Sequence, residues 1–314
     1  MGVDAGGGGD RCAAGGGDGV RPQTIQIYLP FGDPQGLRVA EITTRVVQVF
    51  DVPRSEIAAF FEMPESDQVA VYYLFGDETE DRRIQCYVGQ TNSCRQRFKE
   101  HLKTKAFWSR ALVAVSRTNT KTDTHARYLE WKSIRQGIEA GRYALDNGNA
   151  GSRPHTPAPL QAECEEIFDT ISTLLATLGF PLFQPLATVD PKATDPEVVC
   201  TGRGADAKGV YSHDGLTVFK GSKCAATPTD KATPESIHVR RKRLVEDGTL
   251  EIIQGVPIFA RDTLFKTPSG AADVILFRSA NGWTEWKTKA GVSLSEATQR
   301  GIEKNIDPPK EMAT

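Results

Sequence analysis

Glu130 lies where the sequence predicts a buried face of a helix. Apolar residues recur at three and four along this segment, and Glu130 falls within the same stripe. The stripe consists of Ala126, Leu129, Ile134 and Ile138. Because burying an unpaired carboxylate is costly, Glu130 needs an arginine, a hydrogen-bond network or a metal ion as its partner. The pattern leaves open whether Glu130 is a structural ion pair or a metal ligand.

Arg97 and His101 lie four residues apart on an expected helix, so they project from one face. A guanidinium can hold a phosphate with two hydrogen bonds, and an imidazole can carry a proton near neutral pH. The alternative is a solvated face of a basic helix.

Two tyrosines on expected strands, Tyr72 and Tyr87, add hydroxyl groups that could contact a phosphate or a water molecule. Strand tyrosines more often serve as half-buried packing residues. Taken singly, neither tyrosine distinguishes chemistry from packing.

Positive charge is concentrated in one segment, although the whole chain has a net charge of -2. Residues 92–143 carry 12 Lys and Arg against 4 Asp and Glu, and Lys99, Lys103 and Lys105 belong to this group. A surface that faces phosphates would have this composition, as would a set of solvated helix faces. A second basic run, Arg240, Arg241, Lys242 and Arg243, is another candidate for phosphate binding.

These residues need a small set of elements to position them. Alternating and β-branched residues predict strands at 69–75 and 84–88, which form a hairpin, and a further strand at 111–116. Helices are expected from Asn92 or Ser93 to about 103, and from Thr124 to about 141. A third amphipathic helix is expected from residue 160 to 178.

The whole chain, 314 residues long, is expected to fold as two domains of the α/β (α+β) class. A glycine-rich tail at 1–22 is predicted to be disordered, followed by a β segment and helix at 23–66. The main domain is expected at 67–186, a linker at 187–199, a smaller α+β domain at 200–294 and a flexible tail at 295–314.

Composition narrows the protein class. Hydrophobic content of 39% and charge of 25% are ordinary for globular proteins, and the net charge argues against a uniformly basic DNA-coating protein. The six cysteines are scattered without a CxxC pair, which predicts reduced thiols. No signal sequence or long apolar stretch is present, so a cytoplasmic protein without a membrane partner is expected.

The order of the candidate residues resembles a known nuclease family. Ala70-Val71-Tyr72, followed by Tyr87-Val88-Gly89-Gln90-Thr91, looks like the paired signature of the GIY-YIG nucleases, with alanine in place of the first glycine. Arg97 and His101 match the family's helical arginine and histidine, and Glu130 is similar to its metal-binding glutamate. Its late asparagine corresponds to Asn147 or Asn149.

This resemblance covers residues 69–150 and implies a three-stranded antiparallel sheet flanked by helices. It implies a DNA endonuclease in which Glu130 binds one Mg²⁺ or Mn²⁺ and Arg97 stabilises the transition-state phosphate. Tyr72 or Tyr87, assisted by His101, would position or deprotonate water, which requires a lowered tyrosine pKa. Asn147 is taken as the site asparagine, and Lys99, Lys103 and Lys105 as backbone contacts.

The C-terminal region resembles a domain of unknown function that is appended to a bacterial subgroup of this family. The resemblance lies in segments 219–223, 265–272 and 281–287, the last of which contains Trp283 and Trp286. Both tryptophans are expected in the core, with base stacking as the alternative. Besides an endonuclease of genome defence or repair, two interpretations stay open: a catalytically inactive nucleic-acid-binding scaffold, and a toxin or regulatory protein whose C-terminal domain recognises protein.

Overall fold

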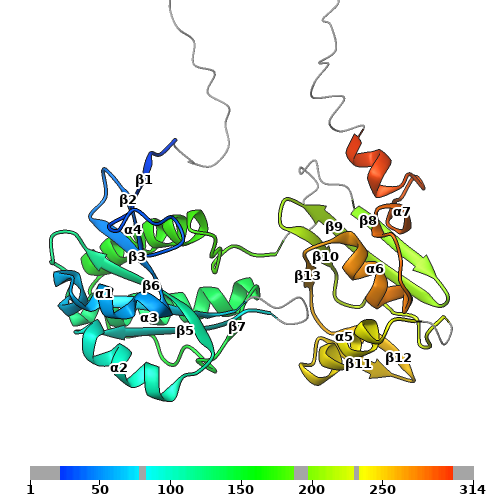
Figure 1. Ribbon diagram of the computed structural model, residues 1–314, viewed down its shortest axis with the longest axis horizontal. Helices are drawn as coiled ribbons and strands as arrows, with labels where there is room; N and C mark the ends of the chain where they lie inside the picture. Colours follow the sequence, from blue (N-terminus) through cyan, green and yellow to red (C-terminus); the bar gives the residue numbers. More distant parts are fainter. Residues whose placement is uncertain (1–21, 78–82, 187–196, 230–232, 300–314) are drawn as a thin grey trace, which may run out of the picture.

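The computed structural model describes residues 22–77, 83–186, 197–229 and 233–299. Two parts follow one another along the chain, each with its own sheet and hydrophobic core (Figure 1). The predicted α+β class is confirmed. Residues 1–21 of the predicted N-terminal tail, most of the linker and the end of the C-terminal tail lie outside the described residues.

The N-terminal part is built on a seven-stranded sheet in the order β1-β2-β3-β6-β4-β5-β7. Neighbouring strands are antiparallel except β5 and β7, which are parallel. The strands are β1 (Ile25–Tyr28), β2 (Arg38–Ile42), β3 (Val47–Pro53), β4 (Ala70–Gly76), β5 (Gln85–Thr91), β6 (Trp108–Ser116) and β7 (Ala144–Leu145).

The predicted three-stranded sheet is the centre of this larger one. Strands β4, β5 and β6 pair as expected, but β3 also pairs with β6 from Val47 opposite Ser116 to Pro53 opposite Arg110. The backbone of a buried strand needs hydrogen-bond partners on both edges, and β3 supplies them to β6. The segment 23–66 is therefore part of the main domain rather than a segment that precedes it.

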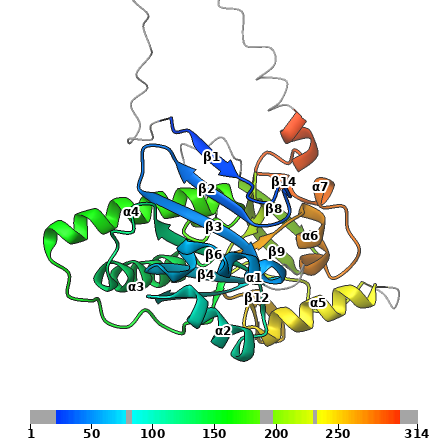
Figure 2. The same cartoon turned by 60° about the vertical axis from the view of Figure 1, so that its left-hand side comes forward.

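Helices cover both faces of this sheet (Figures 1 and 2). On one face lie α3 (Asp123–Ala140) and α4 (Ala158–Thr177), and on the other α1 (Ile57–Phe61) and α2 (Cys94–Thr104). Tyr72 packs in the core beside α1 and α2, whereas Tyr73 packs in the core beside α3 and α4. Both faces of β4 are buried, which explains its unbroken apolar run.

Caps define the helix that carries Glu130. The backbone N–H of Thr122 donates to Nδ1 of His125 at 3.1 Å, which completes a capping box one residue before α3 begins at Asp123. The helix ends at Gly141, whose φ of 65° is the left-handed conformation that favours glycine. The predicted start at Thr124 is thus one residue late.

The C-terminal part has a five-stranded sheet in the order β13-β10-β9-β8-β14 and a separate hairpin, β11-β12. The strands are β8 (Glu197–Gly202), β9 (Ala205–Ser212), β10 (Gly215–Val218), β11 (Leu250–Ile253), β12 (Val256–Phe259), β13 (Thr263–Phe265) and β14 (Lys287–Thr288). The helices are α5 (Glu235–Glu246), α6 (Pro268–Leu276) and α7 (Gly282–Glu285).

The boundaries of this part differ slightly from the predicted ones. Strand β8 begins at Glu197, inside the predicted linker, and residues 294–299 are helical rather than part of a loose tail. Trp286 is buried in the core, and its Nε1 donates to the carbonyl of Pro268 at 3.2 Å. Trp283 is 36% exposed and packs against Tyr211, so only one of these two tryptophans lies in the core.

Candidate functional site

Tyr72 is the centre of a polar cluster formed by β4 and α2. Its side chain is fully buried, with its ring 5.1 Å from that of Phe98. Its hydroxyl oxygen lies 2.7 Å from Nε2 of His101 and accepts a hydrogen bond of 3.1 Å from Nε of Arg97. The helical spacing of Arg97 and His101 therefore does place both on the face of α2 that meets β4.

Gly89 makes room for this arrangement. It is the direct cross-strand partner of Tyr72 in the pair β4-β5. A Cβ atom at position 89 would lie 2.3 Å from the Tyr72 hydroxyl, well inside van der Waals contact. The glycine in the second signature is thus needed for the tyrosine of the first to lie across the sheet.

His101 is neutral at pH 7. It is only 3% exposed, and its ring lies 5.5 Å from that of Tyr72 and 5.4 Å from that of Tyr87. Burial, followed by the positive charges of Arg97 and Lys105, lowers the pKa of His101 to about 4. Its Nδ1 is buried without a hydrogen-bond partner among the described residues.

The tyrosine pKa differs from the expectation. Burial raises the pKa of Tyr72 above its ordinary value, and the hydrogen bond from Arg97 offsets only part of this effect. Tyr72 in the protein alone does not meet the requirement of a lowered pKa, because loss of hydration outweighs the nearby charge. Tyr72 therefore keeps its proton until a ligand changes the electrostatics of the site.

Arg97 links the buried cluster to solvent. Its side chain is 41% exposed, and its Nη1 forms an ion pair of 2.9 Å with Glu100. The hydrogen bond to Tyr72 is the main cause of a raised Arg97 pKa, so the guanidinium stays charged. An exposed guanidinium with an anchored Nε is suited to receive an anion from solvent.

Glu130 reaches the same region from α3. Its side chain is half-buried and forms no ion pair among the described residues, so the structural ion pair left open by the sequence is not present. Burial raises the pKa of Glu130, whereas a backbone hydrogen bond from Gln90, at the end of β5, lowers it. The charge of Arg97 also lowers the pKa of Glu130, and the charge of Glu130 contributes to the raised pKa of Tyr72.

The Glu130 carboxylate suits a divalent cation that needs few protein ligands, such as Mg²⁺. No group of three or more His, Cys, Asp and Glu among the described residues could enclose a metal ion. Mg²⁺, however, commonly binds through one or two carboxylates and keeps water and substrate phosphates as its other ligands. Glu130 is partly desolvated and forms no ion pair among the described residues, which matches that second type of site.

Tyr87 and Lys105 form the rim of the cluster. Nζ of Lys105 lies 4.1 Å from the centre of the Tyr87 ring, a cation–π contact, and pairs with the carboxylate of Asp146. Lys105 is therefore held at the site instead of extending freely toward nucleic acid. The sequence did not predict that Asp146 pairs with Lys105. Its position next to Asn147 is the signal that could have identified it.

Asn147 does not present its amide to a substrate. Its Oδ1 accepts from the backbone N–H of Val88 at 2.9 Å, and its Nδ2 donates to the carbonyl of Val88 at 2.7 Å. The catalytic role predicted for Asn147 is corrected to a positioning role, because both amide groups are engaged in holding β5 beside Tyr87. Asn149 is exposed and accepts from the backbone N–H of Gly151.

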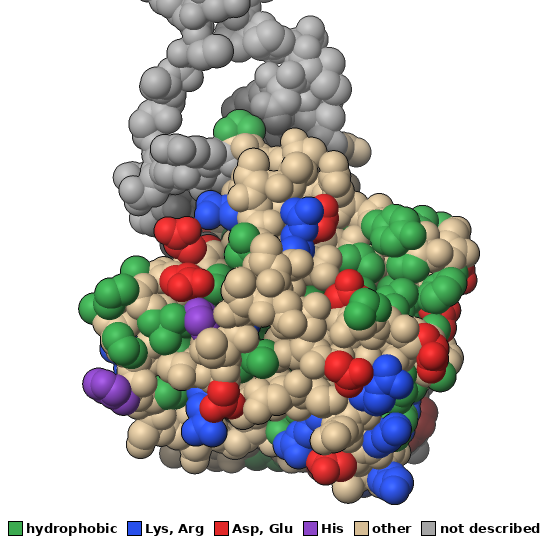
Figure 3. Space-filling view, turned by 90° about the vertical axis from the view of Figure 1, so that its left-hand side faces the viewer, with side chains coloured by type: hydrophobic (Ala, Val, Ile, Leu, Met, Phe, Trp, Pro, Cys, Tyr) green, Lys and Arg blue, Asp and Glu red, His purple; other side chains and the backbone are tan. Residues whose placement is uncertain are grey.

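Most of the cationic side chains of residues 92–143 form ion pairs in the folded protein. Ion pairs with carboxylates engage Arg95, Arg97, Lys105, Arg110, Arg117, Arg127, Lys132 and Arg142. Figure 3 shows one face of the molecule, on which Lys and Arg side chains lie among Asp and Glu rather than in a patch of one sign. Lys99 and Lys103 are exposed, on the side of α2 away from Arg97.

The basic run in α5 contains one residue that cannot bind phosphate. Arg241 is 6% exposed, and its guanidinium donates to the carbonyls of Val274 and Ala225, both at 2.8 Å. The predicted contact of Arg241 with nucleic acid is therefore wrong, because its side chain is buried and hydrogen-bonded to two backbone carbonyls in the core. Lys242 is exposed and lies 4.0 Å from Glu246, while Arg240 and Arg243 are partly exposed.

Comparison with known proteins gives one match. Residues 198–298 match a family described as a domain of unknown function (DUF4357), which coincides with the C-terminal part and confirms that this part resembles a domain of unknown function. No curated protein and no solved structure matches the chain. None of the helices in the described residues has the length and apolar character needed to cross a membrane.

Proposed function

We propose that the Tyr72 cluster is the active site of a metal-dependent endonuclease of the GIY-YIG type that hydrolyses phosphodiester bonds in DNA. The observation that carries the proposal is that Arg97 and His101 both lie within hydrogen-bond distance of the Tyr72 hydroxyl, while Glu130 interacts electrostatically with Arg97 and Tyr72. The resemblance to the GIY-YIG nucleases identified these four residues from their order in the sequence. Their order alone does not require that side chains from β4 and α2 form hydrogen bonds with one another.

Each residue then has a role that suits its surroundings. Arg97 binds a non-bridging phosphate oxygen through the exposed part of its guanidinium. Glu130 would hold Mg²⁺ or Mn²⁺, and the ion would supply electrostatic stabilisation of the charge that develops on the phosphate and the leaving oxygen. Lys105 and Asn147 keep Tyr87 and β5 in place.

Tyr72 and His101 form a path for one proton. A bound phosphodiester brings negative charge that offsets Arg97 and Lys105, the two cations that depress the pKa of His101. Nε2 of His101 then accepts the proton of Tyr72 while Tyr72 takes one from the attacking water. The water oxygen bonds to phosphorus, and the P–O bond to the leaving strand breaks.

Two observations favour a second candidate, a nucleic-acid-binding scaffold with little catalysis. Burial raises the pKa of Tyr72, and no group of three or more metal-binding side chains includes Glu130 in the part of the chain that the structure describes. In this version Arg97 still binds phosphate. The C-terminal part serves to select the DNA in either version, as part of genome defence or repair.

The deciding experiment is cleavage of supercoiled plasmid and branched DNA with Mg²⁺ or Mn²⁺ by the full chain. Glu130→Gln and Arg97→Ala should each lower the rate by at least about a hundredfold, because each removes charge stabilisation from the transition state. Thermal unfolding of every variant shows whether the fold is kept.

Matched controls are Glu139→Gln and Arg135→Ala, since both residues are exposed on α3. These variants should cleave at the native rate. Metal-dependent nicking that survives Glu130→Gln would refute the assignment of Glu130. Absence of nicking by the native chain, with DNA binding that is weakened by Arg97→Ala, would establish the scaffold instead.

A further inference from the structure

A cavity of about 510 Å³ lies between the two parts of the chain. On the N-terminal side it reaches Gly76, the last residue of β4, and Ile84, just before β5. Tyr72 and Gly89 lie toward the other end of these two strands. The cavity is therefore separate from the Tyr72 cluster, and its volume is in the range of small-molecule sites, about 300–1,000 Å³.

A defined polar contact holds the two sides of this cavity together. Nη2 of Arg142 pairs with Asp214 at 2.8 Å across the junction, and its Nε donates to the carbonyl of Gln184 at 3.1 Å. The Arg142 side chain is only 8% exposed. A desolvated ion pair with additional hydrogen bonds is the type that fixes relative position.

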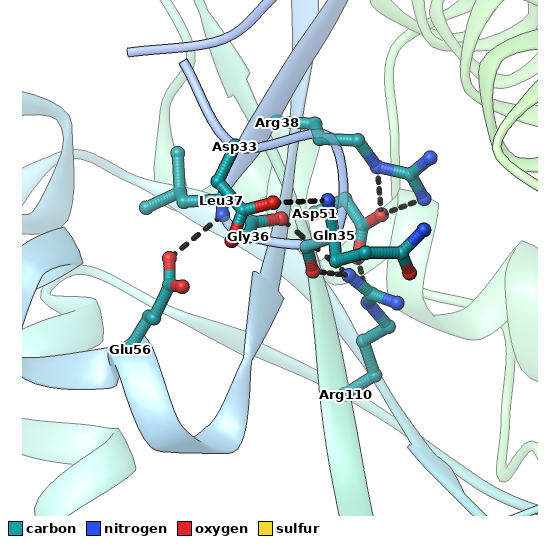
Figure 4. A network of polar contacts seen from close by, with 8 residues as sticks. All are labelled: Asp33, Gln35, Gly36, Leu37, Arg38, Asp51, Glu56 and Arg110. Carbon is teal, nitrogen blue, oxygen red and sulfur yellow. Dashed lines mark hydrogen bonds and ion pairs between the residues drawn. The ribbon is translucent and has the colours of Figure 1, made fainter. Parts of the chain in front are cut away.

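One wall of the cavity is cationic. Its charged lining residues from the N-terminal part are all arginines: Arg38, Arg83, Arg110 and Arg142. Beneath this wall, the carboxylate of the fully buried Asp51 accepts a hydrogen bond of 2.9 Å from Nε of Arg38 and one of 2.7 Å from Nε of Arg110 (Figure 4). One carboxylate shared by two guanidinium groups leaves a net positive charge.

Arg83 adds a further positive charge to this wall. The hydrogen bond that it makes among the described residues goes to a neutral partner, the carbonyl of Gly141 at 3.0 Å. Burial lowers the pKa of Arg83, and the nearby charge of Arg261 acts in the same direction, with Asp247 opposing it. A bound anion would relieve this destabilisation of the charged guanidinium.

The opposite wall offers hydrogen-bond acceptors. The charged lining residues of the C-terminal part are Asp214, Asp247 and Asp262, together with Lys266. Asp262 accepts one backbone N–H, from Lys220, and keeps further acceptor capacity. Apolar and aromatic lining residues complete the cavity, among them Tyr143, Phe180 and Phe265.

We propose that this cavity binds a nucleotide. Its phosphate contacts the arginine wall at Arg83, its ribose hydroxyl or base amino groups donate to the aspartates, and its flat base lies against the aromatic side chains. A simple inorganic anion would use only the first wall, and a neutral nucleoside only the second. The ligand is a free mononucleotide or the 5′-phosphorylated end of a strand, which present the same chemistry.

The test is calorimetric titration of the full chain, in EDTA to prevent cleavage. Probes are AMP, GMP, adenosine, inorganic phosphate, and a short single strand with and without a 5′-phosphate. We expect AMP or GMP to bind at least about tenfold more tightly than adenosine or phosphate, since each lacks one set of contacts. Tighter binding of the phosphorylated strand than of the mononucleotide would identify a strand end as the ligand.

Two variants on opposite walls separate binding from folding. Arg83→Gln should weaken AMP and phosphate alike by about tenfold or more, whereas Asp262→Asn should weaken AMP but leave phosphate unchanged. Arg45→Gln is the control, because Arg45 is an exposed arginine outside the cavity. Nucleotide affinity no greater than that of phosphate, or unchanged in both wall variants, would overturn the proposal whether or not the chain cleaves DNA.

Discussion

Tyr72 owes its position in the polar cluster to Gly89, the residue opposite it, which has no side chain. Gly89→Ala would put a Cβ atom 2.3 Å from the Tyr72 hydroxyl and 2.4 Å from Cζ of the ring. Since both strands are central to the sheet, the ring has to move, at a cost of about 1–3 kcal/mol in the free energy of unfolding. Urea denaturation should show this loss, together with a large fall in any nuclease activity.

A double-mutant cycle with Tyr72→Leu tests the cause of this effect. If the clash with the ring is responsible, Gly89→Ala should cost much less in the Tyr72→Leu background. An equal cost in both backgrounds would mean that the backbone at position 89, rather than the contact with Tyr72, requires glycine.

At this scale the sequence predicted which residues meet better than it predicted what they do. Arg97 and His101 were found through helical spacing, which fixes direction as well as identity. The role of Asn147 could not be predicted, because no local pattern says which backbone an amide faces. Arg241 had a usable signal: Ile237, Arg241 and Leu244 are spaced four and three apart, and all three are buried.

Local sequence patterns predicted most helices and strands of the N-terminal part, but not the pairing of strands that are far apart in the sequence. The strands β4 to β6 and the helices α2 to α4 follow local periodicity, and their predicted limits are close to the observed ones. The pairing of β3 with β6 joins residues about sixty positions apart, from Val47–Ser116 to Pro53–Arg110. Such pairing depends on which edge is free after the rest has folded, so local sequence does not encode it.

The segment before α3 contains an unpaired buried cation, Lys121. It is 7% exposed, its Nζ has no hydrogen-bond partner among the described residues, and burial lowers its pKa to about 8, with Cys164 of α4 opposing that shift. At pH 7 the folded protein thus holds a desolvated charge. We predict that Lys121→Met stabilises the fold at pH 7 by about 1–3 kcal/mol.

The pH dependence distinguishes this explanation from better packing of methionine. Between pH 8 and 10.5 the unfolded chain binds the lysine proton and the folded chain does not, so native stability should rise with pH in this window. The advantage of Lys121→Met should therefore shrink as the pH approaches 10.5. Denaturation at several pH values measures it, with the exposed Lys99→Met as control. An advantage that does not change with pH would contradict the charge argument.

In the folded molecule, ion pairs reduce the number of cations in residues 92–143 that are available to bind phosphate. Residues 92–143 contain 12 cations, and eight of them form ion pairs, six with carboxylates from outside the segment. Those partners include Asp51, Asp146 and Glu165, which lie outside the segment. A local charge count cannot include them, since the fold alone brings them close.

This pairing predicts a modest salt dependence of DNA binding. If every cation of the segment met a phosphate, the slope of log affinity against log salt would be about −11, whereas Lys99, Lys103 and one or two others predict about −3 to −4. Lys99→Ala with Lys103→Ala should reduce the slope by about 2. Lys132→Ala, which removes a lysine paired with Glu165, should leave it unchanged. Fluorescence anisotropy in EDTA measures all three. A slope near −10 would mean that DNA displaces the carboxylates, so that the ion pairs of the free protein are themselves part of the recognition surface.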